Sequence, residues 1–152
     1  MVYVSLTLKF IHIAAAITAV GSNITYGVWN VRAQGDSRQL GFALKGIKFI
    51  DDRIANPAYG VLLVTGLLMV FINHWPITSL WIVLALILFA ALAVLAFRVY
   101  SPLLRNQIKL VDAGDTASPE FVRLSRRSAM LGPILGLLAV LILVMMVFKP
   151  TL

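Results

Sequence analysis

The sequence predicts an all-α integral membrane protein whose four antiparallel spans form a helical bundle, and three observations support this. Of the 152 residues, 61% are apolar and only 12% are charged, against about 45–50% and about 25% in soluble domains. The mean hydropathy is +0.95. The apolar residues gather in four segments; three are close to the roughly 20 residues that cross a bilayer, and the first is longer than necessary. We therefore expect one transmembrane domain over residues 1–152.

Start and stop signals give the predicted bounds of the spans. Asn56 is a suitable N-cap, and Pro57 suits the first helical position. Pro102 is expected to end the third span, because proline disrupts a helix interior. The predicted spans are about 3–31, 56–73, 78–100 and 129–148.

The connecting segments differ sharply in charge, which predicts orientation. The connections between spans one and two and between spans three and four carry the basic residues, whereas Asn73-His74-Trp75-Pro76 carries none. Basic loops stay in the cytoplasm. We therefore expect a multi-pass protein of the bacterial cytoplasmic (inner) membrane with both termini outside.

Residues 39–50 place apolar side chains near one helical face. Leu40, Leu44, Ile47 and Ile50 carry this pattern. It predicts either a short interfacial helix between spans one and two or a cytoplasmic extension of span two. Residues 112–119 are rich in turn formers and predict a break between two helices.

The first span carries a polar seam, which we define as the polar residues repeating at steps of three and four along one helical face. Polar groups rarely face lipid, because an unsatisfied group in hydrocarbon costs several kcal/mol. We expect this face to point into the bundle, either for function or to bond helices together. Its polar members are Ser5, Lys9, His12, Asn23, Tyr26 and Asn30.

The chain's two histidines are candidate ligands near the outer face. His12 lies roughly 30 Å along its helix from Arg32, and His74 lies roughly 30 Å from Arg53. Equal depth would let His12 and His74 share a haem iron or a transition metal. His74 can instead be an interfacial residue without a ligand, and Lys9 can extend its amine to the headgroups.

Spans three and four look structural. Ser128, Gly132 and Gly136 form a series of small residues that permits close helix approach, to a helix of the same chain or of a second copy. The chain has no cysteine, which excludes disulfides and cysteine-bound metal centres. Its basic residues flank apolar runs, so we expect no nucleic-acid partner.

Several short motifs carry a resemblance. Leu-Lys-Phe-Ile-His-Ile at 8–13, Val20-Gly21, Asn56-Pro57-Ala58 and Thr65-Gly66-Leu67 resemble a small bacterial family of four-span membrane proteins of unknown function. More distantly, the chain resembles the HemJ-type membrane protoporphyrinogen oxidases and CopD-type copper-resistance domains. The oxidase resemblance implies haem b or porphyrin at histidines of the membrane helices. The third span lacks a histidine, so only His12 carries over.

These observations leave three functional hypotheses open. The first is a haem- or porphyrin-binding redox protein with His12 as ligand, Lys9 as a contact for an anionic group, and His74 as second ligand or rim residue. The second is a small transporter that uses the polar seam. The third is a non-catalytic accessory subunit that binds a membrane partner or a second copy. Whether the protein is an enzyme stays open.

Overall fold

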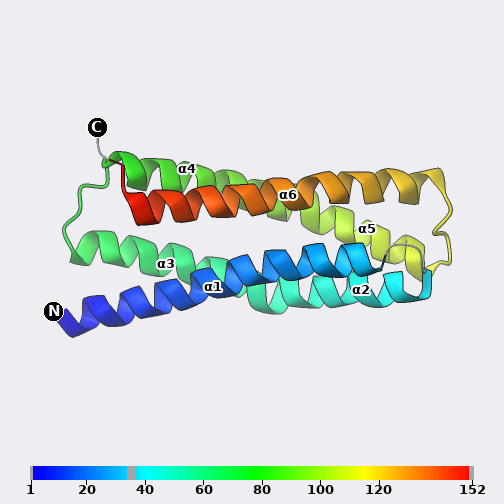
Figure 1. Ribbon diagram of the computed structural model, residues 1–152, viewed down its shortest axis with the longest axis horizontal. Helices are drawn as coiled ribbons and strands as arrows, with labels where there is room; N and C mark the ends of the chain where they lie inside the picture. Colours follow the sequence, from blue (N-terminus) through cyan, green and yellow to red (C-terminus); the bar gives the residue numbers. More distant parts are fainter. Residues whose placement is uncertain (1, 34–36, 151–152) are drawn as a thin grey trace.

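A computed structural model describes residues 2–33 and 37–150, in which the regular secondary structure is helical. Four rods run antiparallel (Figure 1). The first rod is α1 (Val2–Arg32), and the last is α6 (Pro119–Phe148). The second rod joins α2 (Ser37–Ile50), a π-helical turn η1 (Asp51–Ala55) and α3 (Asn56–Ile72). The third joins α4 (Leu80–Val94), a π-helical turn η2 (Leu95–Tyr100) and α5 (Ser101–Asp112).

Most of each predicted span lies in a helix, but the start signal at Asn56 and the stop signal at Pro102 are wrong. Asn56 is not an N-cap and Pro102 does not end a helix, because both rods continue through these points. Each proline follows a π-helical turn, in which the backbone N–H donates five residues back. Asn56 donates to Asp51 in this way, and Ser101 donates to Ala96. The widened turn relieves the clash between a proline ring and the carbonyl four residues earlier.

The fourth rod begins ten residues before the predicted bound at 129. Ser118 is its N-cap, since the Ser118 hydroxyl accepts a hydrogen bond of 3.2 Å from the N–H of Phe121. Pro119 occupies the first turn, where it loses no intrahelical bond. The arginine-rich segment that hydropathy excluded from the span is therefore helical as well. The first rod agrees with its prediction of 3–31 to within one residue.

The rods associate as two pairs. α1 packs on α3 and α4 packs on α6, while contacts between α1 and α6 join the pairs. α2 packs on α5 and α1 at the other end of the bundle. In the described residues α3 and α4 make no backbone approach to each other. Side chains alone connect α3 with α4, among them Tyr59 and Phe89, whose rings pack edge to face at 6.2 Å between centroids.

Residues 39–50 extend the second rod instead of forming a separate interfacial helix. Their apolar face packs into the bundle, with Leu44 and Ile47 almost completely buried beside Leu104 of α5. Lys45 on the opposite face is exposed and forms an ion pair of 2.6 Å with Asp112. Of the two alternatives, the extension of span two is the correct one.

A layer of polar and aromatic side chains crosses the bundle. It marks where the hydrocarbon-length part of each rod begins, the part as long as the hydrocarbon core of a bilayer is thick. The Tyr26 ring stacks on Tyr100 at 6.5 Å between centroids, and its hydroxyl donates to Asp51 at 3.5 Å. Ser128 of α6 lies beside the Tyr100 hydroxyl. From this layer, the remaining length of each rod toward the termini is roughly 30 Å, which equals a bilayer core.

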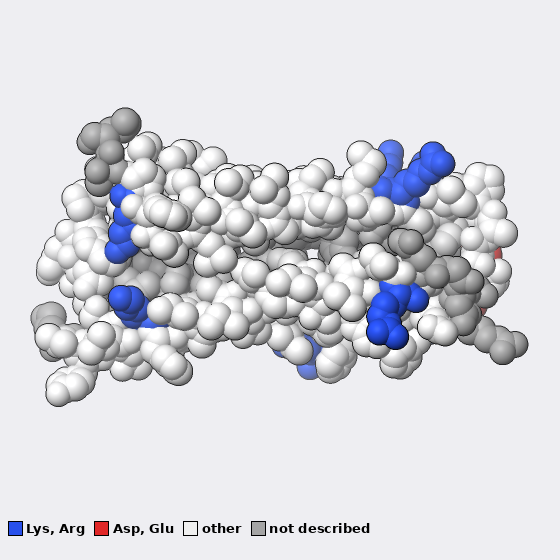
Figure 2. Space-filling model, viewed as in Figure 1, with Lys and Arg blue, Asp and Glu red and all other residues white. Residues whose placement is uncertain are grey.

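The positions of Lys and Arg agree with a membrane boundary at this layer. Figure 2 shows Lys and Arg near both ends of the bundle face, with a mostly uncharged band between them. Arg53, Arg98 and Arg127 lie within two residues of the layer defined by Asp51, Tyr100 and Ser128. α2 and α5 lie beyond that layer, where a polar outer face meets headgroups or water.

Candidate functional site

The polar seam of α1 faces α3. Three side-chain hydrogen bonds connect the two helices at successive levels, so the seam's polar groups lie between helices and not against lipid. From the end near the termini inward, they join Ser5 Oγ to Asn73 Oδ1 (2.9 Å), His12 Nδ1 to Thr65 Oγ1 (2.8 Å), and Asn23 Nδ2 to Tyr59 Oη (2.7 Å).

The remaining seam residues lie in different surroundings. Tyr26 is buried and bonds Asp51, and Asn30 is half-buried close to the Tyr100 hydroxyl. Lys9 is exposed, one helical turn from His12 toward the N-terminus. The seam thus joins helices over most of its length, and among the described residues Lys9 makes no ion pair.

The hydrogen bonds around His12 favour one tautomer of its ring. Nδ1 lies 2.8 Å from Thr65 Oγ1, and the Thr65 hydroxyl donates its hydrogen to the carbonyl of Val61 at 2.6 Å. The Thr65 oxygen is then an acceptor for a proton on Nδ1. In that tautomer Nε2 carries the lone pair, as in histidines whose other nitrogen donates to a fixed acceptor.

Gly66 provides the space that the His12 ring occupies. A Cβ at Gly66 would lie 3.2 Å from Cε1 of His12, tighter than ordinary van der Waals contact. Residues 65 and 66 therefore act together on the ring, one as hydrogen-bond acceptor and the other by its small size. Both belong to the motif Thr65-Gly66-Leu67.

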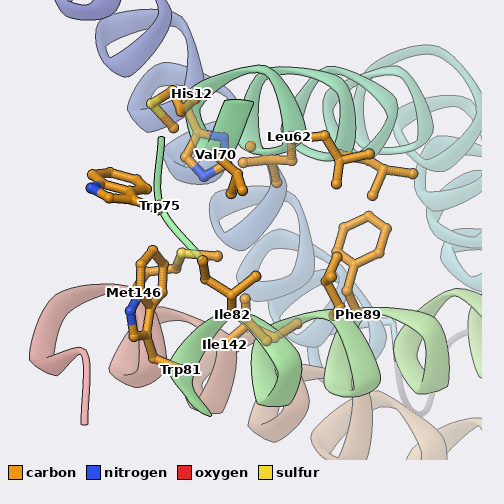
Figure 3. Close-up of a pocket in the computed structure, with 15 residues that line it drawn as sticks. His12, Leu62, Val70, Trp75, Trp81, Ile82, Phe89, Ile142 and Met146 are labelled. Carbon is orange, nitrogen blue, oxygen red and sulfur yellow. The ribbon is translucent and has the colours of Figure 1, made fainter. Parts of the chain in front are cut away.

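A cavity of about 90 Å³ lies next to His12, on the side where α3 and α4 separate (Figure 3). Its lining is almost entirely apolar, and His12 is the ionisable residue among the lining side chains. Leu62 and Val70 come from α3, Ile82 and Phe89 from α4. The cavity thus has an apolar wall that contains one imidazole.

An aromatic pair lies at the terminal end of this cavity. Trp75 and Trp81 line the cavity and pack edge to face, with ring centroids 5.4 Å apart. The ammonium of Lys149 lies 4.7 Å from the centroid of Trp75 and 5.2 Å from that of Trp81. Tryptophans close to the ends of spans are typical interfacial anchors. The joint contact of this pair with Lys149 was not foreseen, because it depends on where α6 ends relative to the loop.

His74 does not join His12. The bonds from Ser5 to Asn73 and from His12 to Thr65 fix the register of α1 against α3, so His74 lies level with the first turns of α1. That places it roughly 10 Å from the level of His12. His74 is exposed, at a φ of 52°. The expectation of equal depth is therefore wrong, because Arg32 and Arg53 are not level with each other.

No group of three or more His, Asp or Glu side chains with metal-site geometry occurs in residues 2–33 and 37–150. Four helices in the same residues are long and apolar enough to cross a membrane. The family model described as "Predicted integral membrane protein (DUF2269)" matches residues 6–150. The chain belongs to this family. No curated protein and no solved structure matches it.

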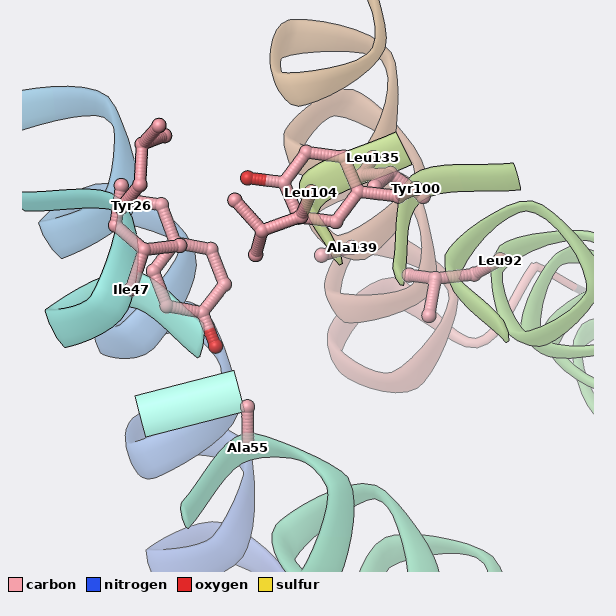
Figure 4. Close-up of a cluster of buried hydrophobic side chains, with 9 residues drawn as sticks. Tyr26, Ile47, Ala55, Leu92, Tyr100, Leu104, Leu135 and Ala139 are labelled. Atoms are coloured by element: carbon pink, nitrogen blue, oxygen red, sulfur yellow. The ribbon is translucent and has the colours of Figure 1, made fainter. Parts of the chain in front are cut away.

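This DUF2269 chain contains a second polar cluster that sequence reasoning missed as a site. The carboxylate of Asp51 is buried against Tyr26, and Tyr100 completes the cluster beside the apolar core of Figure 4. The predicted start of span two at Asn56 leaves Asp51 outside the span. Because the rod extends to Ser37, Asp51 lies in a helix interior and its carboxylate turns into the bundle.

The small-residue series of α6 divides between two environments. Ser128 is buried within the bundle, whereas Gly132 is exposed and Gly136 half-buried. A Cβ at either glycine would meet nothing within 4 Å. Within residues 2–33 and 37–150 no other helix approaches these two glycines closely, and approach by a second copy stays a prediction.

Proposed function

We propose that this membrane protein binds haem b or a related porphyrin at the cavity between α3 and α4, where His12 would supply an imidazole ligand through Nε2. The observation that supports the proposal is the hydrogen bond between His12 Nδ1 and Thr65 beside an apolar cavity. With Nδ1 as the donor, the lone pair of Nε2 is available to a ligand. Neutral imidazole is a common haem ligand.

The chemistry of the lining suits such a group. An apolar wall with aromatic edges matches the faces of a porphyrin. Two ammonium groups, those of Lys9 and Lys149, lie at the end where anionic side groups of a porphyrin would reach the headgroups. When bound, haem supplies one-electron redox chemistry. The protein's part is to hold the ring, exclude water and present Nε2.

The size of the cavity sets a condition on binding. A volume of about 90 Å³ is well below the roughly 300–1,000 Å³ of pockets for cofactor-sized ligands. A porphyrin therefore requires α3 and α4 to move apart. In the described residues α3 and α4 make no close backbone approach, so that motion would break side-chain contacts alone, such as the packing of Tyr59 on Phe89 and of Val70 on Trp81.

The test is a haem titration of the purified protein in mild detergent. We expect a Soret band that shifts on binding, and its loss in His12→Ala. The matched control is His74→Ala, which should bind as the unmodified protein does, because His74 lies at another level. Equal binding by His12→Ala, or no binding by the unmodified protein at any haem concentration, would contradict the proposal.

For the cell, we propose the bacterial inner membrane with both termini outside. The support is charge, since the α5–α6 end carries most Lys and Arg residues and basic segments remain cytoplasmic. Transport through the seam and an accessory role toward a membrane partner stay predictions. The seam's hydrogen bonds to α3 favour cohesion between helices over a water path.

A further inference from the structure

The outward face of α6 carries a basic groove, which we define by its lining residues. It is shallow and open, about 570 Å³ in volume. Positions three and four residues apart on a helix share a face, so the arginines and apolar residues of the groove form one stripe. The lining residues are Ala117, Pro119, Val122, Arg123, Arg126, Arg127 and Met130.

The charges of the basic groove are poorly balanced by the protein itself. Glu120 approaches Arg123 only to 3.9 Å, and both side chains are more than half exposed. Arg126 and Arg127 make no ion pair within the residues that the structure describes. Three guanidinium groups against one carboxylate leave an excess of positive charge. Arginine pairs preferentially with phosphate, which it can bind through two parallel hydrogen bonds.

An apolar stripe continues directly from these arginines along the same helix face. Met130, Ile134, Leu137 and Leu141 follow at steps of four, three and four, and all are exposed. Arg127 adjoins the layer at which the hydrocarbon-length part of the bundle begins. The outward face of α6 therefore changes from cationic to apolar at the depth where a phospholipid changes from headgroup to acyl chain.

We propose that the basic groove binds an anionic phospholipid of the leaflet at the α5–α6 end. Arg123, Arg126 and Arg127 hold the phosphodiester, and one acyl chain lies along the stripe that starts at Met130. The occupant is a lipid and not a soluble phosphate, because the cationic groove and the oily stripe are continuous. The site is separate from the cavity at His12, which lies near the opposite end of the bundle.

The experiment compares lipids of different charge on the full chain in detergent. Binding of phosphatidylglycerol and phosphatidylcholine is counted by native mass spectrometry. We expect preferential retention of phosphatidylglycerol. In Arg126→Gln/Arg127→Gln, its affinity should fall roughly 30-fold, since each basic residue near an anionic surface contributes about 1 kcal/mol.

A control variant separates a site from general charge attraction. Arg32→Gln/Lys109→Gln removes two exposed cations at the same end of the molecule and should leave the affinity within about twofold. An equal loss in this control would overturn the proposal. So would equal retention of phosphatidylcholine.

Soluble glycerol phosphate distinguishes a lipid site from an anion site. We expect it to displace phosphatidylglycerol only at concentrations at least a hundredfold higher, because it lacks the acyl chain. Displacement at equal concentration would show a plain phosphate site and refute the lipid. Circular dichroism of each variant should match that of the unmodified protein, since all substituted side chains are exposed.

Discussion

Polar residues on α1 gain their partners across the helix interface, on the second rod and the loop that follows it. In hydrocarbon an unpaired donor cannot form a hydrogen bond to water. Such pairs are therefore effective in holding two helices at one register. His12 is tied most closely, because Thr65 bonds to its Nδ1 and Gly66 admits its ring. These individual contacts thus hold α1 against the second rod and set the surroundings of the His12 ring.

Replacing Thr65 by Val removes the acceptor for the His12 ring while keeping the volume. We expect the free energy of unfolding to fall by about 0.6–1.7 kcal/mol, the range measured for such bonds in membranes. Circular dichroism during denaturation in mixed detergent measures it. Thr65→Ser retains the hydroxyl and should stay close to the unmodified protein; a Val variant of full stability would show that the bond contributes nothing.

Two glycines of the second rod form a matched pair for testing the space around His12. A Cβ at Gly60 meets nothing, whereas at Gly66 it meets the His12 ring. Gly60→Ala should raise stability by up to about 1 kcal/mol through helix propensity. Gly66→Ala should lose that gain and should weaken haem binding. Thermal unfolding and the Soret titration measure the two effects, and equal behaviour of the variants would contradict the geometry.

At the scale of elements, the two π-helical turns let a transmembrane helix and an amphipathic helix form one rod. Each turn holds one residue more than an α-turn and so changes which face points inward beyond it. Both stand immediately before a proline whose ring needs the wider turn. Propensity alone would end the helix there, but packing of α2 and α5 on each other continues it.

Because a π-turn contains one extra residue, a single deletion inside it should restore an α-turn without changing the register on either side. We expect deletion of Ile54, combined with Pro57→Ala, to give a folded, monodisperse protein. Deletion of Leu63 in α3 with the same proline change should destabilise it, because the rest of α3 rotates by about 100°. Size-exclusion chromatography and thermal unfolding measure the difference. Similar losses in both variants would contradict an inserted residue.

The whole molecule combines a hydrocarbon-length bundle with a helical extension at its basic end. The part from the Tyr26–Tyr100 layer to the termini is roughly 30 Å long. α2, α5 and the start of α6 project beyond that layer, where their charged faces meet headgroups or water. The two functions proposed here lie at opposite ends, the cavity near the termini and the basic groove near the extension.

Orientation can be tested directly, because the chain contains no cysteine. We expect Asp115→Cys to be protected from a membrane-impermeant thiol reagent in intact cells and Thr78→Cys to react. Both positions are exposed outside or at the ends of helices, and they lie at opposite ends of the bundle. Permeabilised cells provide the control, in which both should react. The reverse pattern would invert the proposed topology.

The sequence by itself determined what is local to one helix. Composition and length predicted four spans, charge distinguished the two ends, and a three-four repeat identified the inward polar face of α1. These inferences succeed because the rise and turn of a helix are the same everywhere, and because hydrocarbon excludes polar groups regardless of neighbours.

The tertiary structure decided what depends on two helices at once. The prediction that His12 and His74 lie at equal depth was wrong, because it counted residues along each helix separately. Packing and loop length set the axial offset of α1 against the second rod, and such a count does not include them. The continuation through Pro57 and Pro102, the burial of Asp51 and the separation of α3 from α4 have the same origin. Each depends on contacts between segments far apart in sequence, and those contacts outweighed the local signals.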